Sequence, residues 1–339
     1  ALIFAKEAGY PVIVKASSGG GGRGMRVANN QKELLDGLKS ASSEAKAAFG
    51  DATIFLEKYI EKPKHVEVQI LGDNYGNIVH FYERDCSIQR RHQKVIEIAP
   101  SLYLNNKKRK EVCDYALALA NHVNYRNAGT VEFLLGADGA FYFLEMNTRL
   151  QVEHPVTELV TGRDLVAMQI AVAQGELLGI TQEDITLTGH AIEVRLYAED
   201  VAQDFLPSTG HIDLWRAPGG TGIRVDGGIE TGLDVSPFYD PMIAKIVAHG
   251  PDRAAACAAL SAALGGVEVA GPATNERFLG AIVDHPEFRA GGVDTGFLSR
   301  TMEALAPPPD PVPDDIAALA ARPELTRPGP AAATTWADA

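Results

Sequence analysis

The sequence predicts an α+β fold in two domains, followed by a tail. Apolar and polar residues alternate in several short segments joined by turn residues, as around Gly136–Gly139, which is typical of antiparallel hairpins. Other segments repeat apolar residues every three or four positions, as in Lys107–Tyr125, which predicts amphipathic helices. The 339 residues are enough for two domains, and we place their boundary near residue 188.

Composition is that of an ordinary globular protein with an acidic bias. Apolar residues make up 46% of the chain, and the formal net charge of −13 argues against general binding to nucleic acid or to anionic membranes. No apolar run reaches the length of a membrane span. The three cysteines lie far apart without metal-binding spacing, which favours free thiols in a reducing compartment. We expect the cytoplasm, or the mitochondrial matrix in a eukaryote.

The first 60 residues predict a small unit around a glycine-rich loop. A helix over residues 1–9 stops at Gly9, and Pro11–Lys15 is a buried strand that ends in a lysine. The loop within Ala16–Met25 holds five glycines, which let the backbone approach a ligand closely. A strand, such a loop and a lysine are the parts of a phosphate cradle. The alternative is a flexible hairpin tip, and a lid that closes on a nucleotide would satisfy both interpretations.

A helix and two strands are predicted next. Asn30 starts the helix, because Glu33 follows three residues later as in a capping box. Thr53–Ile60 and His65–Leu71 alternate as strands. Period-two geometry puts one set of polar residues of the second strand on a single face, namely His65, Glu67 and Gln69. That face is interpreted as the wet side of a sheet.

The most basic local segment follows a predicted strand over Asn77–Tyr82. Five basic side chains lie within eleven residues, namely Arg84, Arg90, Arg91, His92 and Lys94. Arginine and lysine suit phosphate or carbonate as ligands. A solvated basic loop is an equally good interpretation, because exposed charges need no specific partner.

The segment Phe141–Pro155 carries oxygen ligands for a divalent cation. It begins as a strand in which Phe141, Phe143, Glu145 and Asn147 share one face. Oxygen donors two positions apart at a strand end suit a hard cation such as Mg²⁺. A dense polar run follows directly, made of Arg149, Gln151, Glu153 and His154. The alternative is a solvated loop after an edge strand.

The preceding strand, Thr130–Leu135, predicts a second carboxylate at the same place. If its last residue pairs with Ala140 across the turn, Glu132 lies opposite Phe143 and diagonal to Glu145. Two carboxylates this close repel each other unless a cation lies between them. A slip of one residue would turn Glu132 to the other face.

Beyond residue 155 the pattern predicts one helix over Thr157–Gln174 and then a strand, Gly189–Tyr197, with Glu193 and Arg195 on one face. Short strands with glycine and proline turns predict a small β-barrel or meander, at His211–Trp215, Ile223–Val225 and Met242–Ala248. Two helices follow, over Asp252–Leu264 and Asn275–Val283. From Pro307 the composition is that of a linker.

Several of these motifs, in this order, resemble biotin carboxylase, an ATP-grasp enzyme. They are Lys15 with Ser18–Gly24, Glu57–Tyr59, His65–Glu67, Glu83–Ser87, Gln89–Lys94, Glu145–Pro155 and Glu193–Asp200. Together with Phe205–Pro207 and His285–Phe288, Arg195–Asp200 is most similar to alpha subunits of biotin-dependent acyl-CoA carboxylases of the 3-methylcrotonyl-CoA or propionyl-CoA type. The resemblance implies an ATP-grasp domain over 1–188 whose residues 1–60 form a glycine-rich lid, a biotin carboxylase C-terminal domain over 189–300, and a Pro/Ala-rich linker over 301–339.

The resemblance also implies a role for each site residue. ATP would be bound by Lys15, Gly21, Gly22, Glu57, Lys58, Tyr59, Ile60, His65, Gln89, His92, Glu132, Leu134 and Glu145. Mg²⁺ or Mn²⁺ would be held by Glu132, Glu145 and Asn147. Bicarbonate would be bound by Lys94, Arg149, Gln151, Val152 and Arg195. Glu153 would be the general base, and Arg195 would stabilise the biotin enolate, so that the catalytic residues are Glu153, Arg149, Arg195 and Lys94.

The implied partners are ATP, bicarbonate, a biotinylated carrier domain, a carboxyltransferase subunit and further copies of the chain. No biotinyl-lysine motif is present, and no lysine follows Lys245. Ser18 stands where the family usually has glycine, and the family's N-terminal domain does not precede Ala1, so we expect a fragment of a longer protein. Two alternatives remain: another ATP-grasp ligase of the carbamoyl-phosphate synthetase type, and a nucleotide-binding fragment without activity.

Overall fold

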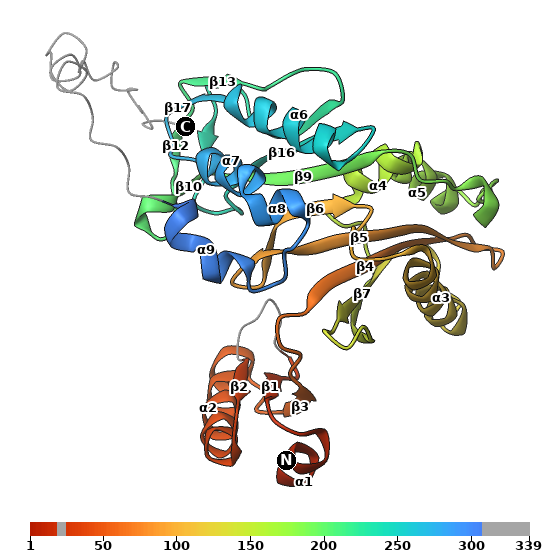
Figure 1. Cartoon of the computed structure of the whole chain (residues 1–339), viewed down its shortest axis with the longest axis vertical. Coiled ribbons are helices and arrows are strands. Elements are labelled where there is room, and N and C mark those ends of the chain that lie inside the picture. Colours follow the sequence, from red (N-terminus) through yellow and green to blue (C-terminus); the bar gives the residue numbers. More distant parts are fainter. Residues whose placement is uncertain (19–24, 307–339) are drawn as a thin grey trace, which may run out of the picture.

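The computed structural model describes residues 1–18 and 25–306, and its first elements form a small unit beside the main sheet (Figure 1). In this unit β1 pairs antiparallel with both β2 and β3. The predicted helix start is confirmed, because the Asn30 side chain accepts a hydrogen bond from the Glu33 amide at 3.0 Å, but the Glu33 carboxylate accepts from the Asn29 amide and not from that of Asn30 as a capping box requires. The predicted nucleotide contacts Gly21 and Gly22 lie outside the described residues. The elements are α1 (Leu2–Ala8), β1 (Val12–Ala16), β2 (Arg26–Ala28), α2 (Gln31–Phe49) and β3 (Ile54–Lys58).

An eight-stranded sheet forms the body of the molecule, in the order β14-β16-β9-β6-β5-β4-β7-β8. All its neighbouring strands run antiparallel, as the alternating pattern predicted. The strands are β4 (Lys64–Gly72), β5 (Ile78–Arg90), β6 (Gln93–Ala99), β7 (Asn127–Leu135), β8 (Phe141–Asn147), β9 (His190–Tyr197), β14 (Ile223–Gly227) and β16 (Met242–Gly250).

The two faces of this sheet differ in chemistry. On one face, apolar side chains such as Val66 and Ile192 pack with the helices α3 and α6 to α9. On the other face, which α4 and α5 cover, alternate positions carry charged residues such as Glu67 and Glu193. No helix of the described ranges is long and apolar enough to cross a membrane. The helices are α3 (Asn106–His122), α4 (His154–Thr161), α5 (Leu165–Ala173), α6 (Arg253–Gly265), α7 (Glu276–Asp284), α8 (Pro286–Ala290) and α9 (Phe297–Leu305).

The single helix predicted over Thr157–Gln174 is wrong, because the structure has two helices there. Helix α4 ends at Gly162, which has a left-handed φ of 66° and donates its amide to the Glu158 carbonyl at 2.8 Å. Helix α5 then begins with Asp164, whose side chain accepts from the Ala167 amide at 2.8 Å. The apolar period continues across the break, so it conceals these stop and start signals.

The predicted barrel-like second domain is also corrected. Within the described residues β9, β16 and β14 extend the main sheet, since β9 pairs with β6 from Ala99↔Ala191 to Ile96↔Val194. The remaining strands form three two-stranded ladders, β10 (Glu199–Asp200) with β11 (Leu206–Pro207), β12 (Gly210–His211) with β15 (Asp234–Val235), and β13 (Leu214–Arg216) with β17 (Glu268–Ala270).

The predicted linker over 301–339 begins too early, because α9 continues to Leu305 and packs on the core of the second half. The rest of that segment lies outside the described residues. Two short 3₁₀ turns complete the fold, at Gln182–Asp184 and Val201–Gln203.

The β7–β8 hairpin has a different register from the predicted one. A bulge places Phe133 opposite Phe143 but Glu132 opposite Glu145. The two carboxylates therefore face each other directly rather than diagonally. Phe143 contacts Phe133, which belongs to the core under α3, so Phe143 does not share the face of Glu145. The prediction that the carboxylates converge survives because the bulge restores their common face.

Strand β4 ends on a glycine that has no room for a side chain. A Cβ at Gly72 would lie 2.4 Å from the Tyr125 carbonyl oxygen. Because overpacking displaces backbone, we expect Gly72→Ala to lower the free energy of unfolding by roughly 1–3 kcal/mol in urea titrations. Gly280→Ala in α7 is the control, since no atom lies within 4 Å of its Cβ, and it should raise stability by roughly 0.5–1 kcal/mol. Equal effects at both glycines would contradict the close approach.

Candidate active site

Lys94 lies on the charged face of the sheet and binds three carboxylates. Its Nζ donates to Glu67 Oε2 at 2.5 Å, to Glu153 Oε1 at 2.6 Å and to Glu132 Oε1 at 2.9 Å. These carboxylates come from β4, from the residue that precedes α4, and from β7. All three are buried. One ammonium group therefore joins residues that are far apart in the sequence.

Arg84 binds the same cluster from inside the protein. Its Nε donates to Glu67 Oε1 at 2.6 Å, and its Nη1 donates to Gln69 Oε1 at 2.8 Å and to Thr157 Oγ1 at 3.0 Å. Arg84 is fully buried, as are Glu67 and Gln69. The interpretation of the His65–Gln69 face as a wet sheet surface is therefore wrong: the three side chains are buried, and Arg84, which binds two of them, also contacts Thr157 of α4.

The five basic residues of the predicted cluster do not form one patch. Arg84 and Lys94 point into the carboxylates, whereas Arg90 pairs with Glu199 at 3.0 Å and Arg91 with Asp204 at 2.7 Å. His92 is exposed in the turn between β5 and β6, with a φ of 67°. Arg84 and Arg90 separate although they are six residues apart on β5, because the pairing of β5 with β6 is irregular between Asp85 and Gln89.

Burial and ion pairing act against each other in the pKa values of the cluster. Burial would raise the pKa of Glu67, but Lys94 and Arg84 lower it to about 2. At Glu132 burial is likewise outweighed, and His65 and Lys94 lower the pKa to about 2. Burial lowers the pKa of Lys94, yet Glu67 and its other acidic neighbours raise it well above its ordinary value. At neutral pH Glu67 and Glu132 are therefore negatively charged and Lys94 is positively charged.

Arg195 of β9 holds the second oxygen of Glu153. Its Nη2 donates to Glu153 Oε2 at 3.0 Å, and its Nε donates to Glu97 Oε1 at 2.6 Å. The side chain of Glu153 is 0% exposed, so its carboxylate lies between Lys94 and Arg195 without contact to bulk water. A carboxylate held by two cations at the centre of a buried charge network is a candidate reactive group.

A pair of acids lies behind Arg195. Glu97 of β6 is the cross-strand partner of Glu193 in β9. Burial raises the pKa of Glu97 to about 7, although Arg195 lowers it. Burial and Glu97 together raise the pKa of Glu193 well above its ordinary value, and neither oxygen of Glu193 has a hydrogen-bond partner among the described residues. Near neutral pH the two buried acids therefore carry a combined charge smaller in magnitude than −2.

The three predicted metal ligands lie together. Asn147 Nδ2 donates to Glu132 Oε1 at 2.9 Å and to Glu145 Oε1 at 3.2 Å, and the two glutamates are direct cross-strand partners. Opposed carboxylates with a neighbouring amide, which also has an oxygen to offer, are the donor set that Mg²⁺ or Mn²⁺ prefers. The residues present therefore fit a hard divalent cation.

The predicted ATP contacts fall into two groups. In the small unit, Lys15 of β1 forms an ion pair with Glu57 of β3, Lys58 donates to the Gly9 and Tyr10 carbonyls, and Tyr59 and Ile60 follow directly after β3. In the main sheet, Gln89 Nε2 lies 2.7 Å from His65 Nδ1, and His65 Nε2 lies 2.9 Å from Glu132 Oε2. Leu134 is the cross-strand partner of His65. The second group therefore adjoins the Lys94 cluster.

The predicted bicarbonate residues are only partly in direct contact. Lys94 and Arg195 both bind Glu153, but Arg149 is exposed and donates to Gln151 Oε1 at 3.1 Å. The Val152 carbonyl accepts from Lys245 Nζ at 2.8 Å. Arg149, Gln151 and Val152 thus lie on the segment that leads into Glu153, without a bond to Lys94.

Sequence reasoning missed two residues of this network. Glu97 lies between Ile96 and Ile98, so the period-two pattern of β6 could have marked it as a lone charged residue on the face opposite these two apolar side chains. Lys245 is the cross-strand partner of Arg195. Nothing local to Lys245 indicates this, because it lies fifty residues after Arg195 in the chain.

Comparisons with known proteins agree with this geometry. Residues 1–181 match the family described as the carbamoyl-phosphate synthase L chain, ATP binding domain, and residues 193–300 match the biotin carboxylase C-terminal domain. The first match covers more than half of the chain and defines an ATP-grasp enzyme as the class. The chain is also 49% identical over 299 residues to biotin carboxylase of Nostoc, covering 88% of this chain and 67% of that protein. The chain belongs to the biotin carboxylase family.

Other relatives are larger proteins. The chain is 48% identical to the mitochondrial methylcrotonoyl-CoA carboxylase subunit alpha of Dictyostelium discoideum over 94% of its own length, but it spans only 46% of that relative. Among solved structures, the biotin carboxylase domain of Hydrogenobacter thermophilus 2-oxoglutarate carboxylase, in complex with MgADP, ADP and bicarbonate, superposes with a TM-score of 0.86 at 46% identity. That match covers 89% of this chain and 67% of that domain.

Glu97 makes the free energy of unfolding fall as pH rises. Its pKa is raised from 4.5 to about 7, so the stability it contributes is fully present below about pH 4.5 and is lost as pH rises through about 7. We expect Glu97→Gln to flatten the fall in free energy of unfolding between about pH 5 and about pH 8, by an amount on the order of a few kcal/mol.

Urea titrations at several pH values measure this effect. Glu303→Gln, at an exposed carboxylate of α9, is the control and should leave the pH curve of the wild type unchanged. The assignment fails if Glu97→Gln follows the same curve as the wild type.

Proposed function

We propose that this chain is the biotin carboxylase part of a biotin-dependent carboxylase, and that it uses ATP and bicarbonate to carboxylate biotin. The observation that carries the proposal is the position of Glu153 between Lys94 at 2.6 Å and Arg195 at 3.0 Å. A general base beside two cations suits a small oxyanion that must be both bound and deprotonated. Membership of the biotin carboxylase family supports the same reaction.

The ATP-grasp domain is proposed for residues 1–188 and the biotin carboxylase C-terminal domain for residues 189–300. The matched ranges 1–181 and 193–300 support this division. The boundary lies within one continuous sheet, because β9 pairs with β6. The sheet therefore brings Arg195, from the second domain, to Glu153 at the end of the first.

In the first step bicarbonate enters as a monoanion and competes with Glu153 for Lys94 and Arg195. As these ion pairs open, a carboxylate oxygen of Glu153 becomes free to accept the bicarbonate proton. The bicarbonate oxygen attacks the γ-phosphorus of ATP, the bond to ADP breaks, and carboxyphosphate forms. Arg149, Gln151 and Val152 are proposed to complete the bicarbonate contacts from the adjoining segment.

ATP is proposed to bind between the small unit and the main sheet. Lys15, Gly21 and Gly22 would hold its phosphates, the segment Glu57–Ile60 its adenine, and a second set of residues the remaining nucleotide, namely His65, Gln89, His92 and Leu134. Mg²⁺ or Mn²⁺ held by Glu132, Glu145 and Asn147 would neutralise the charge that develops in phosphoryl transfer.

Biotin receives the carboxyl group in the second step. Carboxyphosphate breaks into CO₂ and phosphate, the phosphate takes the N1 proton of biotin, and the nitrogen attacks CO₂. Negative charge then develops on the ureido oxygen, and the Arg195 guanidinium stabilises it. Because the side chain of Arg195 is only 13% exposed, its charge acts with little screening by water.

The partners, the oligomeric state and the cellular location are also proposals. A biotinylated carrier domain and a carboxyltransferase subunit are supported by relatives such as the propionyl-CoA carboxylase alpha chain of Ruegeria pomeroyi. Human pyruvate carboxylase is 50% identical, so identity alone does not select the acyl-CoA acceptor over pyruvate. A homo-oligomer is supported by the dimer named for the 2-oxoglutarate carboxylase domain. The cytoplasm or the mitochondrial matrix is proposed because several relatives are named mitochondrial.

The base assignment predicts a specific loss. Glu153→Gln keeps the shape of the side chain but accepts no proton, so ATP binding should persist while bicarbonate-dependent ADP formation with free biotin falls by roughly 10²–10⁴-fold. A coupled ADP assay and nucleotide titration measure the two properties, on the chain alone and on a version extended at its N-terminus.

Glu158→Gln is the matched control, because this buried glutamate of α4 binds Arg224 instead of Lys94. It should keep turnover within a few-fold of the wild type. Unchanged turnover in Glu153→Gln would remove the base assignment. No biotin-dependent ADP formation by either wild-type version would remove the proposed function.

A further inference from the structure

We propose that Asn275 is a positioning residue that fixes Arg195 through the backbone of β9. This inference rests on the proposed role of Arg195 at the biotin oxygen. Asn275 Oδ1 accepts from the Tyr197 amide at 2.9 Å, and its Nδ2 donates to the Arg195 carbonyl at 3.2 Å. Its own amide donates to the Tyr197 carbonyl at 3.2 Å. Asn275 therefore makes three bonds to two residues of one strand.

These bonds act where β9 loses its pairing with β6, while β16 still pairs on its other side. Strand β6 pairs with β9 only as far as Ile96↔Val194, and β16 has a bulge between Ala244 and Met242 beside the end of β9. Arg195 and Tyr197 follow directly after the last β6 pair. The side chain and backbone amide of Asn275 bind the β9 backbone there in place of β6. The end of β9, which carries Arg195, is therefore held against fraying.

The usual role of an asparagine in this position is excluded by the geometry. Asn275 is the N-cap of α7, where asparagine normally accepts a hydrogen bond from the first turn of its own helix. In this structure the side chain makes no such bond. It turns to β9 instead, and the residue is only 2% exposed. A buried amide has to be paired, so the contacts to β9 are its structural purpose.

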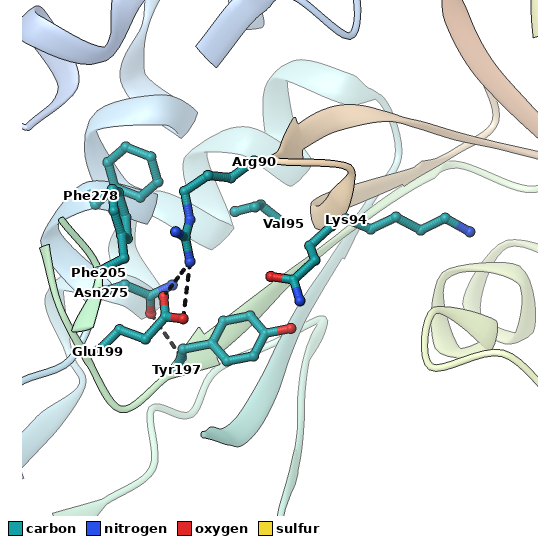
Figure 2. A pocket seen from close by; sticks show the side chains of 9 residues that line it. Arg90, Lys94, Val95, Tyr197, Glu199, Phe205, Asn275 and Phe278 are labelled. Atoms are coloured by element: carbon teal, nitrogen blue, oxygen red, sulfur yellow. Dashed lines mark hydrogen bonds and ion pairs between the residues drawn. The ribbon is translucent and has the colours of Figure 1, made fainter. Parts of the chain in front are cut away.

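Figure 2 shows Asn275 beside Tyr197, in a pocket that Lys94 also lines. The ion pair of Arg90 with Glu199 lies next to Asn275, and the Arg90 guanidinium lies 3.9 Å from the centre of the Phe205 ring. The Lys94 side chain points away from Asn275 in this view. Asn275 touches the site only through the backbone that carries Arg195, which makes it a positioning residue rather than a catalytic one.

Two substitutions separate positioning from helix capping. Serine and aspartate are both good N-caps, but Asn275→Ser is too short to bind β9, and Asn275→Asp keeps the acceptor for Tyr197 while losing the donor to Arg195. We expect kcat for carboxylation of free biotin to fall about tenfold or more in both variants, because small misplacements of a catalytic group are costly. The KM for ATP should stay within about twofold. Asp252→Ser, a cap exchange on α6 whose side chain bonds only its own helix, is the control with unchanged kinetics.

A double-mutant cycle tests the route through Arg195. In an Arg195→Ala background, Asn275→Ser should cause less than about a twofold further loss, because the group it positions is gone. Full kcat in both single variants, or an equal further loss in that background, would overturn the proposal.

Amide hydrogen exchange tests the clamp, meaning the hydrogen bonds of Asn275 to Arg195 and Tyr197 of β9, without an activity assay. The Tyr197 amide should exchange with deuterium at least about tenfold faster in Asn275→Ser than in the wild type, because it loses its acceptor. Equal exchange would refute the clamp. If the wild type shows no biotin-dependent turnover while the exchange rates differ as expected, the proposed function fails but the clamp stands.

Discussion

Three carboxylates share the ammonium group of Lys94 inside this protein, and the rest of the site depends on that contact. Glu67, Glu132 and Glu153 are each less than 5% exposed. Removing a carboxylate from water costs several kcal/mol, which only well-placed partners offset. Arg84 supplies the second partner of Glu67, and Arg195 that of Glu153. The strands that carry these groups and the segment before α4 are therefore held in fixed positions relative to one another.

This constraint also explains how the site can respond to a substrate. Both oxygens of Glu153 are bound by cations, so the carboxylate is not free to accept a proton while the ion pairs persist. An entering oxyanion attracts the same two cations. Under the proposed function, binding of bicarbonate and release of Glu153 as the base would be one event, and the base would become available only when the substrate is present. The acid pair Glu97 and Glu193 behind Arg195 limits the charge around that arginine.

Much of this arrangement follows from local pattern. Alternation along β4 and β7 predicts that His65, Glu67 and Glu132 project from faces of strands. The predicted convergence of Glu132 and Glu145 is confirmed, although they pair directly and not diagonally. The direct pairing depends on a bulge, which period-two reasoning does not reveal. The sequence pattern also leaves open which face is covered. Only the structure shows that Glu67 is interior rather than wet, bound by Arg84, which also contacts Thr157 of α4.

The remaining differences come from contacts between distant segments. Strands β16 and β14 extend the first sheet instead of closing a barrel, because β9 pairs with β6 across about a hundred residues of sequence. Lys245 and Asn275 enter the site in the same way. No motif near either residue indicates its partner. Resemblance to a family supplies the roles of the residues in the motifs, but not the contacts that hold them in place.

The most direct test of this account is the coupling between Lys94 and Glu67 in unfolding experiments. Lys94→Met should lower the free energy of unfolding by roughly 3–5 kcal/mol, because it leaves buried carboxylates without their cation. Glu67→Gln should cost much less in that background than in the wild type, with a coupling energy of at least about 1.5 kcal/mol. Effects that simply add, within about 0.5 kcal/mol, would contradict a site organised around the Lys94 ammonium group.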